Sequence, residues 1–176
     1  MDGLVEVLGW AASIVIVAAF WRRADRHMLW ALLAGLLLMA VHQVGVGAHT
    51  AAAGFAIGAL RTVAVLHWPR SMALMLLFCG ATAVSAALTW SGLVSALAAA
   101  AGIATTVALF VLTGRGLRLA LLPGNGAWIT HHLLTGSMPS LAMEVAIMAG
   151  NLVVARHGHR QLVTGRDARR EATVIP

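Results

Sequence analysis

Apolar residues run through almost the whole chain and are interrupted only by short polar stretches. Seven of the apolar runs are long enough to cross a bilayer as a helix, which takes about 20 residues. These runs are residues 3–21, 28–46, 49–67, 71–89, 91–113, 117–135 and 138–156. Because the connections are very short, neighbouring helices are expected to be antiparallel. The pattern predicts an all-α membrane bundle of seven helices over residues 1–157, followed by a polar tail at 158–176.

The first three predicted helices resemble the last three. A shift of 89 residues aligns 3–67 with 92–156 without a gap, and 17 of the 65 aligned positions are identical, among them His42 with His131. Each half holds an odd number of helices, so one further helix between the halves gives them the same orientation in the membrane. The predicted layout is a first repeat (3–67), a linker helix (71–89) and a second repeat (91–156).

Composition and charge refine this membrane interpretation. Hydrophobic residues make up 60% of the chain and charged residues 10%, whereas about a quarter of a soluble domain is charged. All twelve basic residues are arginine, and they lie in short clusters between apolar runs without the interleaved aromatic residues of a nucleic-acid groove. Eleven of them fall on one side of the predicted membrane and none on the other. The positive-inside rule therefore predicts a cytoplasmic C-terminus and an N-terminus outside.

Two charged residues lie deep inside the predicted spans, Arg61 and Glu144. A central arginine costs about 2.5–3.5 kcal/mol to insert, so Arg61 is expected to face the protein interior or a wet cavity. The repeat alignment puts Glu144 about 9 Å outward of Arg61, which leaves open a stretched salt bridge, a structural pair or an arginine that reaches lipid phosphate. Thr62 and Asn151 are aligned with each other beside Arg61, so the three are expected to form a polar layer at similar depth, in which Thr62 and Asn151 could make an interhelical hydrogen bond. Trp128 is a candidate cap over a solute.

The sixth predicted helix carries further candidates. Pro123, Gly124 and Gly126 interrupt its regular pattern and form either a hinge or a plain kink. His42 and His131 lie near the outer ends of their helices and are candidates for an outer gate that responds to pH. They could also ligate a haem iron or another metal, or reach headgroups and water as interfacial residues. No catalytic or phosphate-binding motif occurs, so the sequence predicts no enzyme, and it assigns no cofactor and no metal.

Several segments are similar to the YgjV-like family of bacterial inner-membrane proteins. They are ALRTVAVL at 59–66, AWITHHLLTGS at 127–137 and MEVAIMAGNLVVAR at 143–156. The predicted layout, two three-helix repeats joined by one linker helix (3+1+3), also resembles the SWEET and PQ-loop superfamily by architecture. That second resemblance implies a solute site near mid-membrane between the repeats, with Thr62 and Asn151 among its lining residues.

These observations together predict a small-solute carrier of the bacterial inner membrane that works by alternating access between its repeats. The alternative is a non-transporting membrane protein, either haem- or metal-binding through the outer-side histidines or an accessory subunit. The expected partners are the lipid bilayer and an unidentified small solute, with no nucleic acid. Assembly into a homo-oligomer is left open.

Overall fold

The computed structural model describes the backbone of residues 3–21 and 26–172 and the side chains of residues 3–19 and 30–156. Throughout these ranges the regular structure is helical. The helices are α1 (Gly3–Trp21), α2 (Arg26–Gly45), α3 (His49–His67), α4 (Met72–Leu88), α5 (Leu93–Val111), α6 (Gly114–Thr135) and α7 (Met138–Ala172). The all-α prediction is confirmed, and apart from the end of α7 the predicted helices begin and end within a few residues of the observed ones. Arg22 and Arg23, which contribute to the arginine asymmetry, lie outside the described residues.

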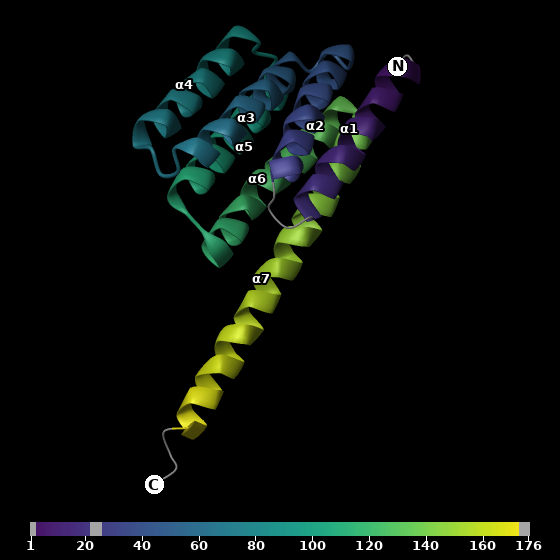
Figure 1. Cartoon of the computed structure of the whole chain (residues 1–176). Coiled ribbons are helices and arrows are strands. Elements are labelled where there is room, and N and C mark those ends of the chain that lie inside the picture. The colour runs from purple at the N-terminus through teal and green to yellow at the C-terminus, as the bar shows by residue number, and fades with distance from the viewer. Residues whose placement is uncertain (1–2, 22–25, 173–176) are drawn as a thin grey trace.

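The last helix differs most from its predicted range. The hydropathy pattern ends the seventh apolar run at 156, but α7 continues as one helix to Ala172. Hydropathy reports where a helix leaves apolar surroundings, not where its backbone hydrogen bonds end, and residues 157–172 contain no proline. Figure 1 shows this second half of α7 projecting away from the other helices. Most of the predicted polar tail is therefore helical.

Six helices pack in a ring around a common interior, and the remaining helix, α4, lies outside this ring. Pairwise contacts link α1 to α2, α2 to α3, α3 to α5, α5 to α6, α6 to α7, and α7 back to α1. The linker helix α4 packs against α3 and α5 (Figure 1). The two contacts that close the ring, α1 with α7 and α3 with α5, join the first half of the chain to the second.

The outer surface of this bundle is apolar. Leucine and valine side chains such as Leu4, Leu76 and Val84 are exposed, as is usual for surfaces that face lipid or a partner. Three helical segments have both the length and the hydropathy that a membrane crossing needs: His49–His67, Leu93–Val111 and Met138–Arg156. Three more are apolar but shorter within the described residues: Gly3–Ala19, Trp30–Gly45 and Met72–Leu88.

The turn that ends α2 recurs at the end of α6, 89 residues later. Gly47 and Gly136 both have positive φ, 81° and 69°, a conformation that glycine adopts without steric cost. The backbone N–H of Ala48 donates to the Gln43 carbonyl oxygen at 2.9 Å, and that of Ser137 donates to the His132 carbonyl oxygen at 3.1 Å. Both are the long bond of a Schellman motif, which ends a helix and turns the chain sharply back. The same type of turn therefore precedes both α3 and α7.

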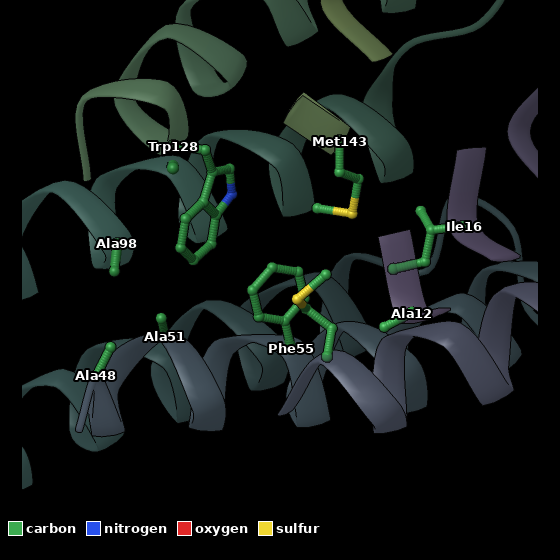
Figure 2. Close-up of a cluster of buried hydrophobic side chains, with 10 residues drawn as sticks. Ala12, Ile16, Ala48, Ala51, Phe55, Ala98, Trp128 and Met143 are labelled. Carbon is green, nitrogen blue, oxygen red and sulfur yellow. The ribbon is translucent and has the colours of Figure 1, made fainter. Parts of the chain in front are cut away.

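The apolar core lies where both halves of the chain meet (Figure 2). Small side chains make up half of it, which lets the helices approach closely. One such approach joins α1 to α2, where a methyl carbon placed on Gly9 would lie 2.5 Å from the His42 ring. The buried cluster consists of Ala12, Ile16, Met39, Ala48, Ala51, Phe55, Ala98, Ala101, Trp128 and Met143.

Candidate functional site

A row of polar side chains lies between α6 and α7 inside the bundle. Arg118 donates from Nη1 to Asn151 Oδ1 at 2.9 Å, and Asn151 donates from Nδ2 to Asn125 Oδ1 at 3.1 Å. Asn125 in turn donates from Nδ2 to Glu144 Oε2 at 2.8 Å. Asn151, Asn125 and Glu144 are all buried. The row therefore leads from a half-buried guanidinium to a buried carboxyl group through two amide side chains.

The spacing of the α6 residues explains why they share one face. Arg118, Asn125 and His132 recur every seven residues, which is about two turns of an α-helix. Trp128 lies one turn from Asn125 and one turn from His132, so it belongs to the same face. The inner face of α6 thus carries polar residues along its whole length, and α7 supplies their partners Glu144 and Asn151.

Arg61 lies apart from this row. Its Nη1 donates to the Thr106 hydroxyl at 2.8 Å and to the Gly102 carbonyl oxygen at 3.3 Å, both on α5. Glu144 bonds to α6 instead, so the stretched salt bridge left open by the sequence is absent from the described side chains. Thr62 donates to the Gly58 carbonyl oxygen of its own helix at 2.8 Å. The structure therefore does not bring Arg61 and Thr62 together with Asn151 in one hydrogen-bonded layer.

Two polar side chains at the end of α2 are bonded to serines at the start of α7. His42 Nδ1 lies 2.7 Å from the Val5 carbonyl oxygen, and its Nε2 lies 2.9 Å from the Ser137 hydroxyl. Gln43 donates from Nε2 to the Ser140 hydroxyl at 2.8 Å. A carbonyl oxygen only accepts, so His42 Nδ1 carries a hydrogen. The Ser137 hydroxyl in turn donates to the Ser140 hydroxyl at 2.8 Å.

The residues 89 positions later repeat only part of this pattern. His131 Nδ1 lies 2.9 Å from the Val94 carbonyl oxygen, the exact counterpart of the bond from His42 to Val5. His131 Nε2 and both ring nitrogens of His132 are buried and have no hydrogen-bond partner among the described residues. His42, His131 and His132 are all 0% exposed. The interpretation of His42 and His131 as interfacial residues is therefore wrong, because neighbouring helices cover both rings.

Aromatic rings surround the unpartnered histidine. The His132 ring stacks on Trp128 with 5.4 Å between centroids and on Phe55 of α3 with 6.3 Å, and Phe55 also stacks on Trp128 at 5.3 Å. The His131 ring meets both Trp128 and His132 edge to face. Figure 2 shows Trp128 directed towards Phe55 across the core. Trp128, which the sequence proposes as a cap, is thus a buried part of an aromatic cluster between α3 and α6.

The predicted hinge lies in an unbroken helix. α6 runs continuously through Pro123, Gly124 and Gly126. A methyl carbon placed on Gly124 would lie 3.3 Å from the Thr105 hydroxyl oxygen of α5, whereas one on Gly126 would have open space. Gly124 therefore allows close packing of α5 on α6, and motion at this proline stays a prediction.

Comparison with known protein families identifies the family of this chain. A family model described as a bacterial inner membrane protein, Imp-YgjV, matches residues 4–161. The chain belongs to the Imp-YgjV family. The resemblance seen in the sequence is confirmed, and the match of this Imp-YgjV chain extends from α1 into the projecting half of α7. No curated protein and no solved structure matches the chain.

Sequence reasoning about this Imp-YgjV protein missed several members of the candidate site. In the sequence, Asn125 stands out only as a neighbour of Pro123, and Arg118 only as one of the eleven arginines on the predicted cytoplasmic side. Their seven-residue spacing with His132 was the signal that could have found them. Ser137 and Ser140 gave no such signal, because two serines in a helical first turn are ordinary capping residues.

A metal centre and a surface groove are the alternatives to this polar interior in the Imp-YgjV chain. Its described side chains include no group of three or more His, Cys, Asp or Glu residues that could hold a metal ion. An apolar groove of about 440 Å³ lies between α1 and α7, and its polar lining residue, Ser13, already lies 2.8 Å from the carbonyl oxygens of Gly9 and Pro139. The polar interior between α6 and α7 is therefore the better candidate site.

Proposed function

We propose that this inner-membrane protein is a small-solute carrier that works by alternating access between two parallel three-helix repeats. The repeats are residues 3–67 and 91–156, with α4 as the linker. The two contacts that join the halves, α1 with α7 and α3 with α5, exchange under the 89-residue shift, as a pseudo-twofold axis along the membrane normal requires. The recurring histidine bonds and glycine turns support the same arrangement. The proposal assigns no catalysis to the chain.

The observation that carries the proposal is the buried row from Arg118 to Glu144. Ionisable and amide side chains are expensive inside a membrane and in general line ion or solute pathways. The proposed pathway follows the inner face of α6, past Asn125 and Trp128, with Glu144 and Asn151 opposite. Arg61 and Thr62 are left out of it, because they bond to α5 and to α3 itself.

Uptake into proteoliposomes tests the carrier function. We expect a panel of small metabolites to include at least one solute that the wild-type protein transports. Glu144→Leu and Asn151→Ala each remove a hydrogen bond to Asn125 and should lower the initial uptake rate about tenfold or more, the change that about 1.4 kcal/mol produces. Thr130→Ala is the control, since Thr130 is on the facing helix α6 but is exposed. Absence of flux for every solute, or equal flux in all four proteins, would contradict the proposal.

The proposed orientation puts the N-terminus outside and the C-terminus in the cytoplasm, with all seven helices spanning the membrane. It rests on the arginines, eleven of which fall on the predicted cytoplasmic side. A fluorescent protein that matures only in the cytoplasm, fused after Pro176, is expected to be bright. The same fusion placed before Met1 should be dark, and the reverse result would overturn the orientation.

A further inference from the structure

The two halves of the molecule provide an internal comparison at the ends of α2 and α6. The 89-residue shift that pairs His42 with His131 also pairs Gln43 with His132. On the facing helices it pairs Ser137 with Ala48. It likewise pairs Ser140 with Ala51. In the first half, the Ser137 hydroxyl lies against His42 Nε2 and the Ser140 hydroxyl accepts from Gln43 Nε2, while Gln43 Oε1 has no partner among the described residues. In the second half, alanines at the start of α3 occupy the corresponding places.

The unpartnered nitrogens correspond to those missing hydroxyls. His131 Nε2 has no described partner, just as His42 Nε2 would have none if Ser137 lacked its hydroxyl group. Figure 2 shows Ala48 and Ala51 directed towards Ala98 and Trp128. The Trp128 ring in turn contacts the rings of His131 and His132. Both alanines are buried with Trp128 in one core cluster. Buried polar groups are almost always hydrogen-bonded, so these nitrogens call for a partner beyond the described residues, and a bound small molecule can provide one.

The protonation of the rings specifies what that group must offer. The Val94 carbonyl oxygen accepts from His131 Nδ1, so His131 Nε2 presents a bare lone pair. A neutral His132 adds one further lone pair and one N–H. A carboxylate has no hydrogen to give to the lone pairs, and an ammonium group cannot accept from the N–H. A hydroxyl group both donates and accepts, as the serines do in the first half.

The serine pair also indicates the spacing of the hydroxyl groups. The Ser137 and Ser140 hydroxyl oxygens lie 2.8 Å apart, within hydrogen-bonding distance of each other. Hydroxyl groups on adjacent carbon atoms lie at a similar separation when they are gauche. We propose that His131 and His132, facing Ala48 and Ala51, bind a small neutral solute through two adjacent hydroxyl groups. This inference rests on the proposed carrier function only in treating the bound molecule as a transported solute.

Supplying the missing hydroxyls from the protein itself tests the proposal. In the Ala48→Ser/Ala51→Ser variant, the second half acquires the serine pair of the first. We expect its thermal unfolding midpoint in detergent to rise by several degrees, because the new hydroxyls satisfy the imidazole nitrogens. Ala52→Ser is the matched control on the same helix and should give no rise.

Binding is measured on the full-length protein in detergent by saturation-transfer NMR with glycerol, erythritol, xylitol and mannitol. We expect the wild-type protein to bind at least one of these polyols and the double serine variant to bind it at least tenfold more weakly. His132→Phe, which keeps a stacking ring and removes both nitrogens, should also lose binding while remaining folded. The His132→Phe variant therefore still tests the proposal if the double serine variant does not fold.

Three results would overturn the proposal. A stabilised serine variant together with a wild-type protein that binds no polyol would mean that the nitrogens hold ordered water only. Unchanged stability and unchanged polyol binding in the serine variant would mean that Ala48 and Ala51 do not face the imidazoles. Polyol binding that survives His132→Phe would place the site elsewhere. Binding needs no flux, so polyol binding without uptake would refute the carrier function and leave this site intact.

Discussion

Replacing His42 by alanine is expected to lower the free energy of unfolding by about 3–5 kcal/mol. The substitution removes a fully buried ring, which leaves a cavity, and it deprives the Val5 carbonyl oxygen and the Ser137 hydroxyl of their partner. Relaxation into the cavity is limited, because α1 already packs closely on this ring at Gly9. Chemical denaturation in mixed micelles, followed by circular dichroism, measures the change.

The repeat supplies the matched control for His42. His131→Ala removes the same ring from the corresponding place in α6 but breaks only the one bond to Val94, because Nε2 has no described partner. Its cost is expected to be smaller by about 1 kcal/mol, the net contribution of one hydrogen bond. Equal costs at the two positions in polyol-free protein would contradict the difference between the halves.

Asn125→Leu is expected to destabilise the protein by about 3 kcal/mol and to be the most damaging single change in the polar row. Leucine has nearly the same size but leaves two buried groups without partners: Glu144 Oε2 loses a donor and Asn151 Nδ2 loses an acceptor. Each buried unsatisfied group costs about 1–3 kcal/mol. The same denaturation measurement tests this expectation.

A second substitution separates the polar network from simple packing. The residues 89 positions before Asn125 and Glu144 are Leu36 and Phe55, so Asn125→Leu/Glu144→Phe gives α6 and α7 the apolar pair of the first half. Replacing a buried polar pair by apolar residues is often neutral or stabilising, whereas breaking it is costly. The double variant should recover at least half of the lost stability while its uptake stays abolished. No recovery would mean that Asn125 acts through packing alone.

The helices were predictable from the sequence because the signals for each helix lie within its own segment of the chain. A run of about 20 apolar residues closed by a turn residue specifies a helix without reference to the rest of the chain, as Gly47 and Gly136 illustrate at the ends of α2 and α6. The extension of α7 to Ala172 was missed because the apolar run ends before the helix does. Family membership was also accessible, since it depends on sequence segments alone.

The candidate site was only partly predictable. Glu144, Asn151 and Trp128 stood out as polar or bulky residues within apolar runs, and all three lie on the interior between α6 and α7 or beside it. Arg61 stood out for the same reason, yet its guanidinium bonds to α5. The sequence shows that a polar side chain within an apolar helix needs a hydrogen-bond partner, but it does not show which neighbouring helix provides that partner.

By itself the sequence determined the helices, the membrane location and the 89-residue relation between the halves, because hydropathy, turn residues and internal identity are properties of neighbouring or aligned positions. Only the tertiary structure decided which side chains meet. It joined Asn125 to Glu144, turned Arg61 towards Thr106, and set His131 and His132 against alanines where His42 and Gln43 meet serines. Those pairings depend on the rotation and packing of whole helices against one another, which the sequence of a single helix does not specify.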